Sequence, residues 1–118
     1  MKGGISVDCV FCKIASGEIP SKKAYEDDKV LAFYDLDPQA PVHILIIPKE
    51  HIQSAADITP DNSAIVAYIF EVAAKLAKEN NLTNGFRIVS NIGKDAGQSV
   101  PHLHFHLLGG RSMKWPPG

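Results

Sequence analysis

The sequence predicts an α+β fold in which an antiparallel sheet of five strands packs with one long and one short helix. The hydrophobic pattern gives the order short helix, three strands, long helix, two strands. Short connections and clustered strands favour antiparallel pairing over a doubly wound parallel sheet. The third strand is apolar on both of its faces apart from His43, which favours a central position covered on both sides.

The first half of the chain is predicted to hold the short helix and three strands. Phe11, Ile14 and Ala15 fall at helical spacing, and Gly17 ends this helix. The strands are expected at 23–26, 30–35 and 42–47, with an Asp27-Asp28 turn after the first and Pro48 ending the third. Alternation along the second strand places Leu31, Phe33 and Asp35 on one face.

The second half is predicted to hold the long helix and two strands. Thr59 is expected to cap the helix, with Pro60 at its first position, and Asn80-Asn81 marks its end. Its apolar stripe consists of Ile65, Val66, Ile69, Phe70, Val72, Ala73 and Leu76. A strand over 86–91, a glycine-bearing loop over 93–97, a histidine-bearing strand and an irregular tail follow.

Length and composition indicate one ordinary globular domain over residues 1–118, with a flexible segment at 1–8 and a tail at 109–118. The net charge of -1 offers no field for holding a nucleic-acid backbone, so nucleic-acid partners are not expected. The sequence contains no apolar run of 18 or more residues and no stretch typical of a signal peptide, so neither a membrane partner nor secretion is expected. We therefore expect a cytoplasmic protein, or a nuclear one if the source is eukaryotic.

Three of the five histidines, His102, His104 and His106, occupy alternate positions near the C-terminus. In an extended strand they form a row on one face, opposite Leu103 and Phe105. Three imidazoles with no adjacent carboxylate argue against satisfied core residues. The row therefore indicates either a catalytic metal site or metal-free nucleophilic or acid–base catalysis, because imidazole is partly neutral and nucleophilic near pH 7.

The segment before the row is suited to phosphate oxygens. Asn91, Gly93, Gly97, Gln98 and Ser99 supply neutral donors and flexible backbone N–H groups. The common phosphate loop GxxxxGK[ST] is absent. A phosphate held by this segment would lie in line with an imidazole nitrogen.

The segment QSVPHLHFHLL at 98–108 resembles the signature of the histidine triad superfamily, His-φ-His-φ-His-φ-φ with φ apolar. FCKI at 11–14, EIP at 18–20, YEDD at 25–28, LAF at 31–33, PQAPVH at 38–43 and IPK at 47–49 resemble the histidine triad nucleotide-binding branch. The ending GGRSMKWPPG is similar to that same branch. The resemblance covers nearly the whole chain from Cys9 onward.

The resemblance implies binding of purine nucleoside monophosphates and hydrolysis of nucleoside phosphoramidates, including aminoacyl adenylate-like substrates. His104 matches the nucleophile, whose Nε2 attacks the α-phosphorus and gives a nucleotidyl-histidine intermediate that water hydrolyses. No cofactor is expected for this step. The resemblance also implies a homodimer in which two sheets join into a continuous sheet of ten strands.

Further positions match the family residue by residue. His106, Asn91 and Ser99 match phosphate contacts, with Ser99 near the leaving group, and backbone N–H groups of Gly97, Gln98, Ser99 and Val100 would bind phosphate oxygens. Asp35 matches the ribose-binding carboxylate, His43 the histidine that tunes the site, and Trp115 a tail residue that reaches the partner subunit's site. The base-pocket walls match Phe11, Ile14, Phe33, Leu36 and Leu45. By periodicity alone, Ile14, Phe33 and Leu45 are core residues.

The pair Cys9 and Cys12 lacks the strand-to-helix context of a thioredoxin-like redox motif and needs two further ligands to hold zinc. Some relatives supply them with a histidine after Ile-Pro-Lys-x and with the first triad histidine, which match His51 and His102 here. The resemblance thus implies a structural zinc, with unligated thiols as the alternative. Pro101 departs from the family pattern and is expected at the start or edge of the last strand.

Three rival functions remain open at this stage. The first is an AMP-binding regulatory or scaffold protein, which the complete set His104, Ser99 and His106 disfavours. The second is a dinucleoside polyphosphate hydrolase of the same superfamily, which the Trp-Pro-Pro-Gly tail disfavours. The third is a zinc hydrolase with its metal on the triad.

Overall fold

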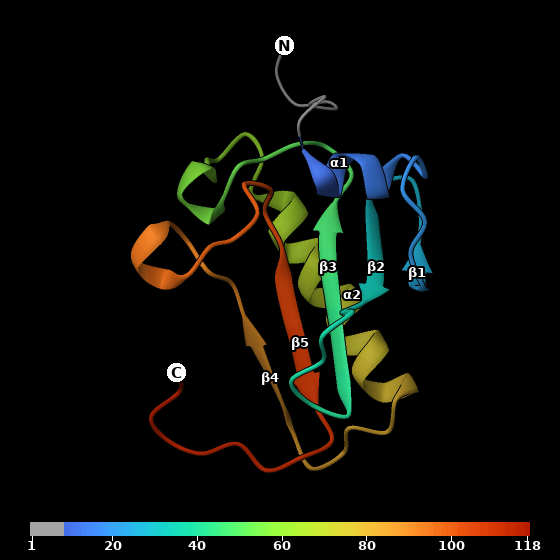
Figure 1. The fold of residues 1–118 in the computed structure, drawn as a ribbon, viewed down its shortest axis with the longest axis vertical. Helices are drawn as coiled ribbons and strands as arrows, with labels where there is room; N and C mark the ends of the chain where they lie inside the picture. The colour runs from blue at the N-terminus through green and yellow to red at the C-terminus, as the bar shows by residue number, and fades with distance from the viewer. Residues whose placement is uncertain (1–8) are drawn as a thin grey trace.

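The structure is a computed structural model that describes residues 9–118; the segment 1–8, predicted to be flexible, lies outside the described residues. The described residues form an antiparallel sheet of five strands with one short and one long α-helix, which confirms the predicted fold class. Figure 1 shows this arrangement. The elements are α1 Val10–Ala15, β1 Lys23–Glu26, β2 Val30–Tyr34, β3 Val42–Pro48, α2 Ala64–Glu79, β4 Phe86–Val89 and β5 Phe105–Gly109, with short 3-10 turns η1 Ala55–Asp57 and η2 Lys94–Ala96.

The strands lie in the order β1-β2-β3-β5-β4, so β3 is central as its apolar sequence predicts. The β3–β5 register places Leu45 opposite His106 and Ile44 opposite Leu107. Residues directly opposite each other in an antiparallel pair point to the same face. The register therefore places His106 on the face of Leu45 and places Leu107 on the other face.

The two faces of the sheet carry separate hydrophobic clusters. On one face Ile44, Ile46, Phe105 and Leu107 pack with Ile69, Val72, Ala73 and Leu76 of α2. On the other face Leu31, Phe33, Leu45 and Ile47 pack with Cys9, Phe11 and Cys12 of the α1 segment. Figure 1 shows α2 lying along the sheet and α1 crossing it at the end where β3 finishes. None of the described helices is long and apolar enough to span a membrane.

The long helix begins four residues later than predicted. Thr59 does cap a turn, because its hydroxyl oxygen accepts the N–H of Asp61 at 3.2 Å, but α2 begins only at Ala64. The Asn62 side chain accepts the N–H of Thr59 at 2.7 Å and closes the segment into a separate turn. The Thr-Pro-Asp pattern therefore marks the turn that leads into the helix. The apolar stripe is correct in register, although Phe70 is 46% exposed and meets Phe105 in a T-shaped arrangement with ring centroids 5.6 Å apart.

The last strand is shorter than predicted. β5 begins at Phe105, and the segment that holds His102 and His104 is not paired in the sheet and bends at His102. Pro101 lies four residues before the strand, and the N–H of Leu103 bonds to the carbonyl of Ile52 in a loop. β4 ends at Val89 and β2 at Tyr34, before their predicted ends, while β3 includes Pro48.

Asp27 joins the β1–β2 turn to α2. Its carboxylate accepts hydrogen bonds from the Tyr25 hydroxyl at 2.9 Å, from the Tyr68 hydroxyl, and from the N–H groups of Lys29 and Val30 at 2.8 and 2.9 Å. Burial acts to raise the pKa of Asp27, but these hydrogen bonds outweigh it and hold the pKa well below its ordinary value of 3.8. The ionised carboxylate therefore stabilises the fold, and this contribution is present above pH 3.8 and is lost as the pH falls below it.

We expect Asp27→Ala to lower the free energy of unfolding by about 2–3 kcal/mol at pH 7, because four donors lose a charged acceptor. Asp28→Ala, at the exposed neighbouring position, is the control and should change it by less than about 0.5 kcal/mol. Urea unfolding of both variants at pH 7 and pH 3 measures this difference. Equal stabilities of the two variants at pH 7 would show that the Asp27 hydrogen bonds contribute little.

Candidate active site and metal centre

The row of histidines lies on the face of the sheet that α1 covers, as the alternation predicts. His106 is in β5, and His102 and His104 precede it with the same orientation. The ring of Phe11 in α1 lies edge-on to both, with centroid distances of 6.1 Å to His102 and 5.1 Å to His104. Leu103, Phe105 and Leu107 point to the opposite face and pack in the α2 cluster.

The backbone determines which ring nitrogen of His104 carries a lone pair. Nδ1 of His104 lies 2.7 Å from the carbonyl oxygen of His102. A carbonyl can only accept, so Nδ1 carries the hydrogen and Nε2 carries the lone pair in the neutral ring. The Ser90 hydroxyl donates to the His104 carbonyl at 3.0 Å and secures this part of the chain. His104 therefore presents Nε2 as a nucleophile or a base.

His43 and His106 form a hydrogen-bonded pair whose proton order follows from one backbone N–H. Gln39 donates its N–H to Nδ1 of His43 at 3.0 Å, so the neutral His43 ring carries its hydrogen on Nε2. That Nε2–H donates to Nδ1 of His106 at 2.9 Å. The hydrogen of neutral His106 is consequently on Nε2. His106 can therefore donate from Nε2 to an oxygen of a bound ligand.

Burial keeps this pair of imidazoles neutral. Burial lowers the pKa of His106 to about 4, and the neighbouring His104 and His43 lower it further while Asp35 opposes the shift. Burial also lowers the pKa of His43 from its ordinary value of 6.5, against the opposing charges of Asp35 and Asp37. Both rings are thus uncharged near pH 7, and each offers one donor and one acceptor.

The four residues predicted to hold zinc converge in the structure. Nδ1 of His102 lies 3.3 Å from the Cys9 sulfur and 3.5 Å from the Cys12 sulfur, and Nδ1 of His51 lies 3.2 Å from the Cys12 sulfur. All four potential ligand atoms lie within 4.8 Å of one another. Cys9, Cys12 and His102 are buried, and His51 is half-buried.

This donor set fits a tetrahedral zinc ion. Bond lengths of about 2.3 Å for sulfur and 2.0–2.1 Å for nitrogen give a ligand-to-ligand distance of roughly 3.5 Å in a tetrahedron, close to the three distances observed. Nε2 of His102 donates to the Pro48 carbonyl at 2.8 Å, so its Nδ1 lone pair faces the thiols. The other potential cluster, Asp35 with His43 and His106, fits less well, because the N–H of Gln39 keeps the lone pair of His43 on Nδ1.

The predicted phosphate segment is held by its own side chains. The Asn91 amide donates to the Ala96 carbonyl at 2.7 Å, and Gln98 accepts the N–H of Gly93 at 2.8 Å. The Gln98 amide also donates to the carbonyls of Gln53 and Val100. Gly97 has a φ of +79°, a conformation that favours glycine. In this arrangement Asn91 and Gln98 shape the loop, and Ser99 is exposed on it.

The residues predicted to form the base pocket are only partly brought together. Phe11, Phe33 and Leu45 lie in one buried cluster, with Ile14 and Val100 packed against it. Leu36 is instead fully exposed. Asp35 lies at the rim of the histidine pair, with one carboxylate oxygen 3.5 Å from Nε2 of His43 and the other accepting the N–H of Asp37.

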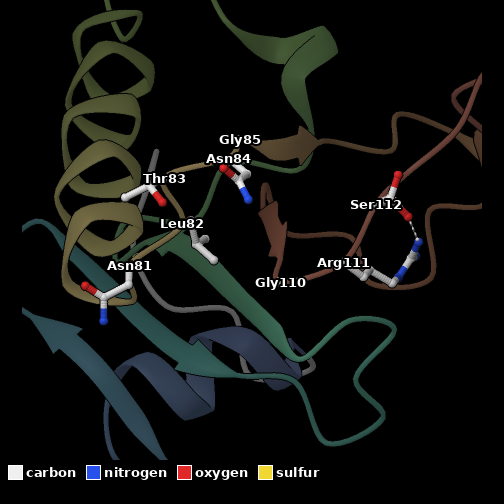
Figure 2. Close-up of a pocket in the computed structure, with 8 residues that line it drawn as sticks. All are labelled: Asn81, Leu82, Thr83, Asn84, Gly85, Gly110, Arg111 and Ser112. Carbon is white, nitrogen blue, oxygen red and sulfur yellow. Dashed lines mark hydrogen bonds between the residues drawn. The ribbon is translucent and has the colours of Figure 1, made fainter.

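Trp115 lies in the tail and is 84% exposed. Figure 1 shows the tail leaving the end of β5 and passing the end of β4, on the side away from α1. A hollow of about 360 Å³ lies between the start of this tail and the turn after α2. Figure 2 shows the residues that line it, which include Leu82, Gly110 and Arg111. Its lining contains none of the site residues predicted from the sequence.

The structure adds residues to the site that sequence reasoning missed. Gln39 and Pro48 act through backbone atoms, and Ser90 acts through its hydroxyl. Every residue has a backbone carbonyl and nearly every residue has a backbone N–H, so the residue type gives no signal that would identify Gln39 or Pro48. Ser90 lies at the end of β4, next to the predicted phosphate contact Asn91, which is the one signal that could have found it.

The fold is a five-stranded antiparallel sheet, and the site consists of histidines on one face of it whose ring hydrogens are placed by backbone contacts. These two features define the class of protein. The family model described as HIT domain matches residues 16–113, and the chain belongs to this family. The chain is 50% identical to a 14 kDa zinc-binding protein of Zea mays over 111 residues, which cover 92% of this chain and 87% of the relative.

Two solved structures extend the comparison. A HIT family hydrolase from Legionella pneumophila is 52% identical, with a TM-score of 0.92 over 94% of this chain and 100% of that one. A histidine triad nucleotide-binding protein from Candida albicans is 37% identical, with a TM-score of 0.78 over 94% of this chain and 85% of that one.

Proposed function

We propose that the protein is a purine nucleoside phosphoramidate hydrolase of the histidine triad nucleotide-binding branch, acting on adenosine 5'-phosphoramidates. The observation that carries this proposal is the proton order of the histidines: His104 offers a lone pair on Nε2, and His106 offers a hydrogen on Nε2. A nucleophile beside a neutral donor suits attack on a phosphorus atom whose oxygens need hydrogen bonds.

In the proposed reaction, Nε2 of His104 attacks the α-phosphorus and the P–N bond breaks. The leaving nitrogen carries away the bonding electron pair and takes up a proton, so an amine departs. Water then cleaves the bond between phosphorus and His104 and releases the nucleoside monophosphate. As positive charge develops on the His104 ring, its Nδ1–H bond to the His102 carbonyl becomes stronger.

The remaining residues have supporting roles in this proposal. His106 donates from Nε2 to a phosphate oxygen, and the backbone N–H groups of 97–100 bind the others. Ser99, exposed on the loop, faces the leaving group. Asp35 takes the ribose hydroxyls, and Phe11 with Phe33 and Leu45 forms one wall of the base pocket. Leu36 would complete the wall when a base covers its exposed side chain.

We expect His104→Asn to lower kcat for an adenosine phosphoramidate by at least about 10³-fold, because the nucleophile is lost. Binding of AMP should remain largely intact, since the hydrogen bonds of His43 and His106 do not involve His104. Single-turnover assays and calorimetric titration with AMP measure the two quantities. Turnover like that of the wild type in the Asn variant would exclude His104 as the nucleophile.

Two further measurements separate the proposal from its rivals. Acid-quenched turnover should trap a phosphorus–nitrogen adduct on His104, which an AMP-binding scaffold protein would not form. The rate of hydrolysis should be higher for an adenosine phosphoramidate than for a dinucleoside polyphosphate. A higher rate on the polyphosphate would assign the chain to that other hydrolase class.

We also propose that Cys9, Cys12, His51 and His102 hold a structural zinc ion. The ligand distances near 3.5 Å and the Pro48 carbonyl behind His102 support this assignment. Four protein ligands leave no open position, so the ion would fasten the N-terminal segment and α1 to the sheet. Phe11, between the two cysteines, would then be held with its ring against His104.

Protein purified without chelator is expected to contain about one zinc ion per chain, measured by mass spectrometry of the metal content. Cys12→Ser should lose most of this zinc and lower the melting temperature, because the site loses a thiolate ligand. His43→Asn, which leaves the four ligands in place, is the control and should retain the metal. Protein without zinc and with two freely titrating thiols would refute the assignment.

We propose further that two copies of the chain join through β4. Among residues 9–118, β4 pairs with β5 alone and so lies at the edge of the sheet. Phe86 of β4 and Phe70 of α2 are 43% and 46% exposed. Phe86 also helps to line an apolar hollow of about 230 Å³, together with Ala74, Ala77 and Leu82. Pairing of two such edges would give one sheet of ten strands and bring Trp115 toward the partner's site.

The protein is expected to have about twice the monomer mass of 12.8 kDa in sedimentation velocity experiments. Phe86→Glu should convert it to the monomer at micromolar concentration, because a charge would be buried against the partner. Leu36→Glu alters a fully exposed apolar residue on another part of the chain and should remain dimeric. A monomeric wild type would exclude this interface.

A further inference from the structure

The loop between β2 and β3, residues 35–41, is tied to the histidine site by three backbone N–H groups. The N–H of Asp37 donates to the Asp35 carboxylate at 2.8 Å, and the N–H of Gln39 donates to Nδ1 of His43 at 3.0 Å. The N–H of Asp35 also bonds to the carbonyl of His43 at 3.1 Å. A displacement of this loop would therefore change the hydrogen bonds of Asp35 and His43.

The Gln39 N–H is the group that orders the protons of the histidine pair. If it moved away, neutral His43 could place its hydrogen on Nδ1 and its lone pair on Nε2. Nε2 of His43 would then accept from Nδ1 of His106, and the hydrogen on Nε2 of His106 would be lost. The donor that His106 presents thus depends on the Gln39 N–H, together with the Asp35 carboxylate, which lies 3.5 Å from Nε2 of His43 and also favours a hydrogen there.

The first residues of the C-terminal tail, Gly110 and Arg111, hold the loop at Gln39 in place. Arg111 donates from Nε to the Gln39 carbonyl at 3.0 Å and from Nη1 to the Ser112 carbonyl at 3.2 Å. Gly110, with a φ of +91°, lies so close to the loop that a Cβ there would approach Pro41 Cβ to 2.9 Å. Figure 2 shows Arg111 and Ser112 on the tail side of the hollow, with the dashed bond between them.

We propose that Arg111 is a positioning residue for the pair formed by His43 and His106. Its hydrogen bond fixes the Gln39 carbonyl, so the N–H of the same residue stays aimed at Nδ1 of His43. Arg111 contacts neither imidazole in this arrangement. Its effect passes through the loop to the tautomer of His43, and from there to the hydrogen that His106 presents.

The test is the nitrogen NMR spectrum of the imidazoles at pH 7.5 in Arg111→Ala, with Ser112→Ala as the control on the same tail. The wild type and the control should show His43 protonated on Nε2 and His106 protonated on Nε2. Arg111→Ala should show a mixture of tautomers for both rings. Arg111→Lys, which retains one donor and the charge, should restore most of the wild-type pattern.

The effect on turnover rests on the proposed function, whereas the NMR comparison needs no substrate. Arg111→Ala is expected to lower kcat for an adenosine phosphoramidate about three- to tenfold, the effect of losing one hydrogen bond. If Arg111→Ala fails to fold, Arg111→Met keeps the aliphatic stem without donors and takes its place. Tautomers like those of the wild type in a folded donor-less variant would overturn the proposal, whether or not the wild type hydrolyses phosphoramidates.

Discussion

The structure depends on the alternation of side chains along residues 102–107, because the apolar residues of this segment face α2 and its histidines face α1. Leu103, Phe105 and Leu107 enter the core beneath α2, so the three imidazoles must point to the other face. A slip of one residue would bury the histidines in an apolar core, which the cost of burying unpaired polar groups forbids. The hydrophobic effect on one face thus determines where the chemistry lies on the other.

The imidazoles differ in function because different backbone groups face them. His102 donates to the Pro48 carbonyl and turns its lone pair to the thiols, whereas His104 donates from Nδ1 to the His102 carbonyl and keeps its lone pair on Nε2. His106 carries its hydrogen on Nε2, because the Gln39 N–H places the hydrogen of His43 on Nε2, which donates to Nδ1 of His106. A neutral imidazole has one donor and one acceptor, so a single backbone contact determines what its other nitrogen can do.

The cysteine cluster and the nucleophile share a neighbour in Phe11. The centroid of its ring lies 6.1 Å from that of His102, 5.1 Å from that of His104 and 5.6 Å from that of Phe33. A zinc ion on the four-residue cluster would fasten α1, a helix of six residues that is too short to be stable by itself. The proposed metal therefore acts on the catalytic face through packing, while its coordination leaves no position for a substrate.

The sequence by itself determined the fold class and the central position of β3, which follow from the order and apolarity of the elements. It also determined that Leu31 shares a face with Phe33, and His106 with His104, because these follow from alternation along a strand. It misplaced the start of α2, because Thr59 caps a separate turn, and it continued the last strand over His102 and His104, which lie before the strand in an unpaired segment with a bend at His102. Only the tertiary structure decided which nitrogen of each histidine carries a hydrogen. The contacts responsible come from backbone atoms of Pro48, Gln39 and the histidine segment itself, and the position of a backbone atom in space is not encoded in the type of residue that carries it.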